Sequence, residues 1–255
     1  AISPSALSAL AVLHVWGIHR LRLLCSAHGR ELVALLGTSP SQMGQDFLAA
    51  LVLLNKHDGF FVEAGACDGV FSSNTLELEQ RFGWTGLLCE PGRMWVDRLR
   101  ANRRCTIDTR ALWAETGHQL SFREAIRPNL STLAEFIDGD MHASERQTSS
   151  IEYSVESISL ADLLQLHGAP THIDFLSLDT EGSEQVILQD FPFDKYSFSV
   201  IAVEHNYSDS NAGLEELLTS RGYVLLAELE SVALGDHWFI SPEVALTLRE
   251  RGLRP

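Results

Sequence analysis

The pattern of hydrophobic and polar positions changes once along the chain, near residue 60. Before this point, residues 6–36 carry Leu, Val and Ala at helical spacing, which predicts one or two amphipathic helices. After a break at 37–41 that contains Gly and Pro, a second helical pattern covers residues 41–55. From residue 60 onward, short apolar runs alternate with helical segments, and this alternation predicts repeated βα units.

Five of the apolar runs predict the strands of a parallel sheet. Strict alternation of apolar and polar residues is absent from them, which is typical of strands covered by helices on both faces. Each run ends on an acidic residue. The runs are residues 60–63, 86–90, 105–108, 173–179 and 199–204. Two later runs have no helix between them and predict an antiparallel hairpin that closes the sheet edge; they are residues 223–227 and 237–240. The predicted fold class is α/β, with a doubly wound and mostly parallel sheet.

The segment 124–157 fits neither the strand pattern nor the helix pattern. It is polar, contains Pro128, and lies between the third and fourth predicted strands. Long irregular insertions in compact domains often form lids or binding loops, so we expect a lid here. The predicted organisation is a helical N-terminal extension over residues 1–40 and one α/β domain over residues 41–255.

Composition and charge narrow the class of protein. With 255 residues, 45% of them hydrophobic, the chain is long enough to bury the core of one α/β domain. Its 34 acidic residues outnumber 19 basic ones and give a formal charge of -15. Such a surface repels a phosphate backbone and anionic lipid, so we expect a small-molecule partner and neither nucleic acid nor a membrane. The apolar stretch 6–24 is interrupted by His and Arg and is too broken to span a bilayer.

The four cysteines indicate a reducing compartment. Cys25, Cys67, Cys89 and Cys105 form no C-x-x-C pair, and three of them lie in or beside apolar runs. This spacing favours buried thiols over a disulfide framework or a zinc site. We therefore expect a cytoplasmic protein. Separately, the apolar faces of the helices predicted over residues 6–36 could pair two chains as a homodimer.

The loop after the first predicted strand suits an amino-acid moiety. Gly65 and Gly69 allow a tight turn and a close approach to a ligand. Their spacing is not G-x-G-x-x-G, and no G-x-x-x-x-G-K-[ST] occurs, so dinucleotides and nucleoside triphosphates are poorly supported. The acidic Glu63 and Asp68 suit an ammonium group. A helix start at Asn74, spaced from Glu77 as in a capping box, suits a carboxylate.

Glu90, at the end of the second predicted strand, suits a ribose. A carboxylate there can accept hydrogen bonds from both ribose hydroxyls, as the acidic residue of dinucleotide-binding folds does. An amino acid and a ribose without phosphates together describe S-adenosylmethionine. The expected cofactor contacts are Glu63, Gly65, Ala66, Asp68, Gly69, Asn74, Thr75, Glu90, Pro91, Asp108, Ala111 and Asp179.

Six segments also carry a family resemblance: 44–47 (GQDF), 61–69 (FVEAGACDG), 73–79 (SNTLELE), 83–91 (GWTGLLCEP), 102–103 (NR) and 174–182 (DFLSLDTEG). Together they resemble the FkbM-type methyltransferases over roughly residues 41–241. The resemblance implies a class I methyltransferase sheet, S-adenosylmethionine as cofactor, and methylation of a hydroxyl on a sugar or natural product. Ala64 and Cys67 replace residues more usual in the family's loop, and Gly92-Arg93 follows Glu90-Pro91.

The fourth and fifth strand ends supply candidate chemistry for the acceptor. Methylation of an alcohol requires loss of a proton whose pKa lies far above 7, which a general base or a bound cation would assist. His205 is the candidate base, with Asp179 and Glu204 as further catalytic candidates. Asp179, Glu181 and Glu204 could instead hold Mg²⁺ or another divalent cation through oxygen ligands. Turn-forming roles for the two glutamates and a structural hydrogen bond for His205 stay open as alternatives.

Two other features receive structural interpretations. Arg103 and Arg104 are expected in a solvated turn, and Trp113 is a candidate for the wall of an adenine pocket. The leading functional hypothesis is a S-adenosylmethionine-dependent O-methyltransferase acting on a sugar, glycoside or natural product. The alternatives are a cofactor-binding module without turnover and a nicotinamide-dependent oxidoreductase, the latter disfavoured by the glycine spacing.

Overall fold

The computed structural model describes residues 34–35, 38–125, 130–136, 150–204, 212–227 and 236–251. The predicted N-terminal helices of residues 6–36 lie almost wholly outside this part of the chain. Within the described ranges, no helix is both long and apolar enough to cross a membrane.

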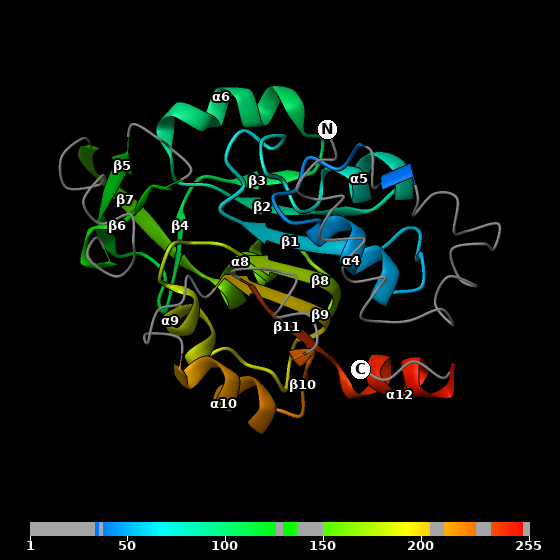
Figure 1. The fold of residues 1–255 in the computed structure, drawn as a ribbon. Coiled ribbons are helices and arrows are strands. Elements are labelled where there is room, and N and C mark those ends of the chain that lie inside the picture. Colours follow the sequence, from blue (N-terminus) through cyan, green and yellow to red (C-terminus); the bar gives the residue numbers. More distant parts are fainter. Residues whose placement is uncertain are drawn as a thin grey trace.

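A seven-stranded sheet forms the centre of the fold (Figure 1). Its strand order is β10-β11-β9-β8-β1-β2-β3, and β11 is antiparallel to both of its neighbours while the other pairs are parallel. The strands are β1 (Phe60–Ala64), β2 (Thr85–Cys89), β3 (Thr106–Asp108), β8 (His172–Leu178), β9 (Ser197–Glu204), β10 (Val224–Leu225) and β11 (Asp236–Ile240). The predicted doubly wound, mostly parallel sheet is confirmed.

The predicted C-terminal hairpin is also confirmed, with one refinement of its position. Val224 pairs with Ile240 in antiparallel register, but β11 lies between β9 and β10, so that β10 forms the edge. Trp238, Phe239 and Ile240 are fully buried, whereas the two residues of β10 are half-buried. The more apolar strand therefore takes the interior position, where both of its faces are covered.

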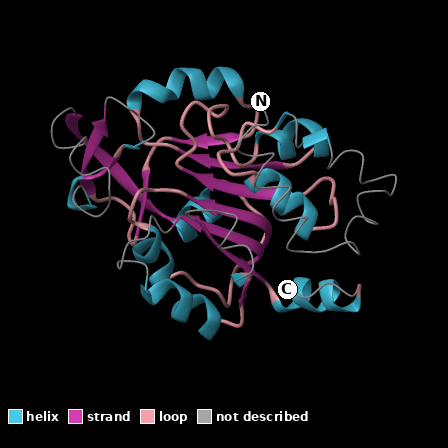
Figure 2. Ribbon diagram, in the orientation of Figure 1, coloured by secondary structure: helices cyan, strands magenta, loops and turns pink. Residues whose placement is uncertain are grey.

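Helices cover both faces of this sheet (Figure 2). They are α4 (Gln45–Val52), α5 (Leu76–Phe82), α6 (Arg93–Asn102), α8 (Leu160–Leu166), α9 (Glu184–Gln189), α10 (Ala212–Ser220) and α12 (Pro242–Glu250). Successive strand residues enter opposite cores: Phe61 packs in the cluster with α4, α5 and α12, and Val62 in the cluster with α8, α9 and α10. This two-sided burial is why the strands have continuous apolar runs.

A second, four-stranded sheet contains much of the segment that we expected to be irregular. It has the order β4-β7-β5-β6, with a 3-10 turn, η2, after β6. Its elements are β4 (Ala111–Trp113), β5 (Gln119–Ala125), β6 (Thr132–Leu133), η2 (Ala134–Phe136) and β7 (Ser150–Ser159). The irregular character predicted for 124–157 is thus wrong for 124–125, 132–133 and 150–157, which are strands. In 150–157, polar residues alternate with Ile151, Tyr153 and Val155 as in a half-exposed strand. Residues 126–129 and 137–149 of the insertion lie outside the described ranges.

Trp238 provides a test of the packing in the hydrophobic core on one face of the sheet. Its ring is fully buried and stacks on Phe175 of β8, with 5.9 Å between the ring centroids. We expect Trp238→Ala to lower the free energy of unfolding by about 3–5 kcal/mol, because the cavity cannot collapse against the rigid strands. Leu246→Ala, on the exposed side of α12, should change it by less than about 0.5 kcal/mol. Equal changes in urea unfolding would contradict this account of the core.

Candidate functional site

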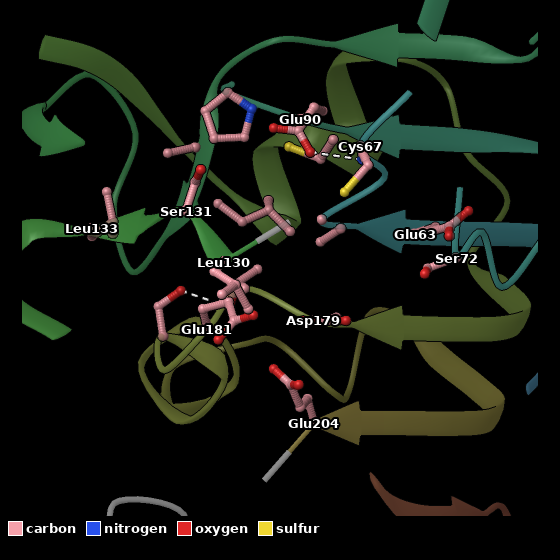
Figure 3. A pocket seen from close by; sticks show the side chains of 18 of the residues that line it. Glu63, Cys67, Ser72, Glu90, Leu130, Ser131, Leu133, Asp179, Glu181 and Glu204 are labelled. Atoms are coloured by element: carbon pink, nitrogen blue, oxygen red, sulfur yellow. Dashed lines mark hydrogen bonds between the residues drawn. The ribbon is translucent and has the colours of Figure 1, made fainter. Parts of the chain in front are cut away.

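A cavity opens at the carboxyl ends of β1, β2, β8 and β9, where the second sheet faces the first (Figure 3). Its volume is about 1090 Å³, part of it open to solvent. Seven of the twelve expected cofactor contacts line it: Glu63, Gly65, Asn74, Glu90, Pro91, Ala111 and Asp179. The others do not: Ala66, Asp68, Gly69, Thr75 and Asp108.

The second sheet and the N-terminal segment contribute lining residues that the sequence did not reveal. Leu112, Phe122, Leu130, Ser131 and Leu133 come from β4–β6 and the turn before β6. The cavity is also lined by polar and thiol side chains that were not predicted from the sequence: Gln42, Cys67, Ser72, Cys89, Thr180 and Ser183. Apart from Ala111 of β4, no sequence signal identified the lining residues of the second sheet, and those at 130–133 lie in the segment whose polar character concealed its strands.

Glu90 has the geometry expected of a ribose acceptor. Its Oε2 accepts a hydrogen bond from the Cys67 backbone N–H at 2.8 Å, and its Oε1 accepts one from the Gly92 N–H at 2.6 Å. Each carboxylate oxygen keeps a further lone pair for a hydroxyl donor. Burial raises the pKa of Glu90 to about 7, and the nearby charges of Glu124 and Asp179 act in the same direction.

Gly65 is required by the approach of two strand ends. Its φ is +80°, and a Cβ at this position would lie 1.8 Å from the backbone oxygen of Asp179. The Asp179 N–H donates to the Ala64 carbonyl at 3.2 Å, and the Gly65 N–H donates to the Cys89 carbonyl at 3.0 Å. The glycine therefore lets β8 close against β1; it also lines the cavity, and its approach to a ligand stays a prediction.

The carboxylate of Glu63 accepts hydrogen bonds from the protein's own loop before α5. Its Oε1 accepts from the Asn74 backbone N–H at 2.7 Å, and its Oε2 accepts from the hydroxyls of Ser73 and Thr75. Both oxygens thus hold the loop before α5, which argues against the expected direct contact with an ammonium group.

The capping box predicted from Asn74 and Glu77 is absent. Helix α5 begins after Thr75, which makes no side-chain cap hydrogen bond. The Asn74 amide nitrogen instead donates to the Ser177 hydroxyl at 2.9 Å, and Glu77 pairs with Arg81. Asn74 Oδ1 is buried at the cavity and has no hydrogen-bond partner among the described residues. Asn74 is therefore a better candidate than Glu63 for contact with a cationic group.

Asp68, Gly69 and Asp108 have structural roles. The Asp68 carboxylate accepts from the N–H groups of Val70 and Phe71, as in an Asx turn. The Asp108 carboxylate accepts from Arg110 and from His167 Nε2 at 2.9 Å. Burial opposes the charge of Asp108, but these hydrogen bonds outweigh it and lower the pKa to about 2. Because Arg110 and His167 occupy this carboxylate, the structure gives no support to the expected cofactor contact of Asp108.

A cluster of three carboxyl groups lies on the other side of the cavity from Glu90 (Figure 3). Asp179, Glu181 and Glu204 each offer an oxygen, and these oxygens lie within 4.8 Å of one another. A hydrogen bond joins the carboxyls of Asp179 and Glu204. Burial raises both pKa values, and the negative charges of Asp179 and Glu181 raise that of Glu204 further.

Backbone geometry holds Glu181 in this cluster. Its φ of +59° lies in the left-handed region, and the Thr132 hydroxyl of β6 donates to its carbonyl at 2.8 Å. The Glu184 carboxylate accepts from the Thr180 and Gly182 N–H groups and so closes the loop beneath it. His205, our candidate base, lies outside the described residues, next to Glu204.

The cluster suits either a shared proton or a hard cation. Carboxylate oxygens are the ligands that Mg²⁺ and Ca²⁺ prefer, and three of them lie within 4.8 Å of one another here. Of the described residues that line the cavity, none is Lys, Arg or His. The site thus has a buried carboxylate, Glu90, on one side of the cavity and an acidic cluster on the other.

Comparison with known sequences identifies the family. A model of the methyltransferase FkbM domain matches residues 63–225, more than half of the chain. The chain belongs to the FkbM methyltransferase family. The predicted resemblance is confirmed, and membership implies a S-adenosylmethionine-dependent enzyme. No curated protein matches significantly.

Comparison with solved structures gives a match of low similarity. A chain of the fibrillarin/Nop5p complex is similar over 79% of this chain and 81% of its own length, at 10% identity and a TM-score of 0.37. A likeness at this level carries no functional argument.

The residues of the FkbM cavity fit S-adenosylmethionine in chemical terms. Glu90 retains acceptor capacity for two hydroxyls, and the buried Asn74 Oδ1 is an acceptor for an ammonium group. Small and apolar residues that also line the cavity, including Pro91, Ala111 and Leu112, suit an adenine ring. Trp113 is not among the lining residues; its ring lies 6.0 Å from that of Phe136.

The pKa of Glu90 predicts a pH dependence of cofactor binding. Only the ionised carboxylate accepts from both ribose hydroxyls, so affinity should be complete above pH 7 and fall as the pH drops through 7. Glu90→Gln should weaken S-adenosylmethionine binding by about 1.5–3 kcal/mol and remove this dependence. Titration calorimetry between pH 5.5 and 8.5 (roughly 1.5 units to either side of that pKa) measures both. A flat profile for the unmodified protein together with unchanged affinity in Glu90→Gln would exclude the ribose assignment.

The contact of Gly65 with Asp179 predicts that an added side chain at Gly65 causes a severe steric clash. A second glycine with positive φ, Gly117, serves as the control for the backbone penalty alone. Gly117 also has a positive φ, +90°, but a Cβ there would meet nothing within 4 Å. Gly117→Ala should therefore cost only the left-handed backbone penalty of about 1–2 kcal/mol. Gly65→Ala adds a clash with the Asp179 carbonyl, and we expect it to be less stable than Gly117→Ala by several kcal/mol in urea unfolding. Similar losses in the two variants would show that the strand ends can separate.

Proposed function

We propose that this FkbM methyltransferase transfers the methyl group of S-adenosylmethionine to a hydroxyl of a sugar, glycoside or natural product. The observation that carries the proposal is the placement of Glu90 and the Asp179/Glu181/Glu204 cluster on opposite sides of one cavity. In the reaction, the acceptor oxygen attacks the sulfonium methyl carbon, the S–CH₃ bond breaks and S-adenosylhomocysteine leaves. The hydroxyl proton must pass to a base.

The arrangement of polar groups supports one orientation of the cofactor. The ribose hydroxyls would bind Glu90, the adenine would lie near Pro91 and Leu112, and the methionine portion would lie along the loop that ends at Asn74. This orientation leaves the fourth and fifth strand ends for the acceptor. The sulfonium methyl would then face the carboxyl cluster.

The second sheet supports a sugar-like or natural-product acceptor. Leu130 and Leu133 supply an apolar wall, and Ser131 supplies a hydroxyl beside it. Across the cavity lie the three carboxyl groups. A molecule with an apolar face and a hydroxylated edge satisfies both walls, because its hydroxyls can donate to carboxylates while its C–H face packs against leucine.

Two routes could remove the proton. His205 follows Glu204 in the chain and would act as a general base, as its side-chain type suggests. Alternatively, Asp179, Glu181 and Glu204 would hold a divalent cation, which when bound lowers the pKa of a coordinated hydroxyl. The lack of cationic side chains among the described lining residues favours the cation, since it would neutralise the three carboxyls, of which Glu181 is buried and Asp179 and Glu204 are half-buried.

Turnover with variants of both groups distinguishes these routes. Formation of S-adenosylhomocysteine would be measured with extract-derived hydroxylated acceptors. Glu204→Gln should cut turnover by about 10²–10⁴ while S-adenosylmethionine affinity stays within a few-fold, since the cluster serves the acceptor. With a cation, chelation abolishes turnover, and Mg²⁺ or Mn²⁺ restores it. With a His base, chelation has no effect, and His205→Ala causes the loss.

Glu243→Gln, on the exposed side of α12, is the matched charge control and should retain full turnover. Binding of S-adenosylmethionine without turnover under any condition would favour a cofactor-binding module. Full activity of Glu204→Gln would remove the cluster from the mechanism.

A further inference from the structure

Arg103 is buried where the sequence predicted a solvated turn. It follows the last residue of α6, and its side chain has 0% exposure, whereas the neighbouring Arg104 is exposed. A buried guanidinium is costly unless its charge and its N–H groups are matched. Its partners therefore indicate what it holds in place.

Those partners come from the loop behind the cofactor site. Arg103 Nη1 donates to the Gly69 carbonyl at 3.2 Å and to the Ser73 hydroxyl at 3.0 Å, and Nη2 donates to the Thr75 hydroxyl at 2.9 Å. Arg103 Nε donates to Glu79 of α5. Four hydrogen bonds from one planar group thus tie the two ends of segment 69–75 to helix α6 and helix α5.

The same guanidinium provides the counter-charge for Glu63. Arg103 Nη1 lies 3.6 Å from Glu63 Oε2, and both side chains are buried. Glu63 in turn accepts from the Asn74 backbone N–H, and the Thr75 hydroxyl contacts Glu63 and Arg103 alike. Asn74 lines the cavity, whereas Arg103 does not.

Gly69 completes this arrangement. A Cβ at Gly69 would lie 2.5 Å from Arg103 Cγ, so the glycine leaves the passage through which the arginine enters. Gly69 was expected to approach the ligand; its observed role is to admit the side chain that organises the loop. Lysine cannot replace this arginine fully, because an ammonium lacks the planar fork that reaches several acceptors at once.

We propose that Arg103 is a positioning residue for the methionine end of the cofactor site. It acts through Glu63, Ser73 and Thr75 to set Asn74, and it does not touch the cofactor. The proposal rests on the cofactor orientation given under Proposed function. Arg103 should therefore govern the binding of the amino-acid portion and leave the ribose and adenine portions unaffected.

Two ligands separate these portions. S-adenosylmethionine carries the amino acid, whereas methylthioadenosine has the same adenine and ribose but lacks it. We expect Arg103→Lys to weaken S-adenosylmethionine binding by about 10–100-fold, the range for lost hydrogen bonds to charged groups, with methylthioadenosine within about three-fold. Arg104→Lys, the exposed neighbour, should change neither affinity. Calorimetric titration of the three proteins with both ligands measures the selectivity.

A milder variant guards against a failure of Arg103→Lys to fold. Thr75→Val keeps the volume and both charges but removes the hydroxyl that joins Arg103 to Glu63. It should show the same selectivity with a smaller loss. Equal weakening of both ligands, or no weakening of either, in a folded Arg103→Lys or Thr75→Val protein overturns the proposal.

Glu90→Gln tests the underlying cofactor orientation separately. It should weaken both ligands alike, because both carry the ribose hydroxyls. If Glu90→Gln leaves methylthioadenosine binding unchanged, the orientation is wrong, whatever the Arg103 variants show.

Discussion

The close contact between Gly65 and the Asp179 carbonyl is the constraint on which the site depends. No side chain fits between them, because a Cβ at Gly65 would lie 1.8 Å from that oxygen. Hydrogen bonds from Gly65 to Cys89 and from Asp179 to Ala64 join the same three strand ends. Glu90 directly follows β2, and the acidic cluster begins at the end of β8. The junction therefore sets both walls of the cavity relative to each other.

Buried carboxylates serve two different purposes around this junction. Glu63 and Asp108 each have an arginine within ion-pair distance, Arg103 and Arg110 respectively, and both carboxylates organise loops. Glu90 and Asp179 face the cavity, and burial raises their pKa values. Burial disfavours the charged form of these carboxyl groups. A ligand that donates hydrogen bonds or carries positive charge stabilises that charged form, so its binding is favoured. This difference separates residues that build the site from those suited to act in it.

The central sheet could be predicted from the sequence because strands buried on both faces consist of consecutive apolar residues. Residues such as Phe61 and Val62 are both apolar because each enters a different core. The strand ends then located Glu90 and the carboxyl cluster, since parallel strands finish at one edge.

What the sequence could not reveal depends on contacts between distant segments. Asp68 and Asp108 have the right residue type and the right position. The N–H groups of Val70 and Phe71 already donate to Asp68 Oδ1, and Arg110 and His167 occupy both oxygens of Asp108. The apolar wall of the cavity comes from a second sheet whose half-exposed strands resemble loop sequence. The burial of Arg103 depends on acceptors in segment 69–75, which no local pattern specifies.

The second sheet and the carboxyl cluster cannot be placed independently of each other. Thr132 of β6 holds the carbonyl of Glu181, whose left-handed backbone is costly for a residue with a Cβ. Gly182 faces Phe136: a Cβ added to the glycine would lie 3.0 Å from Phe136 Cβ, so η2 packs directly on this loop. Leu130 and Leu133, which flank Thr132, line the cavity. A shift of the apolar wall would consequently move Glu181, and an acceptor that packs against this wall also acts on the position of the carboxyl group beside it.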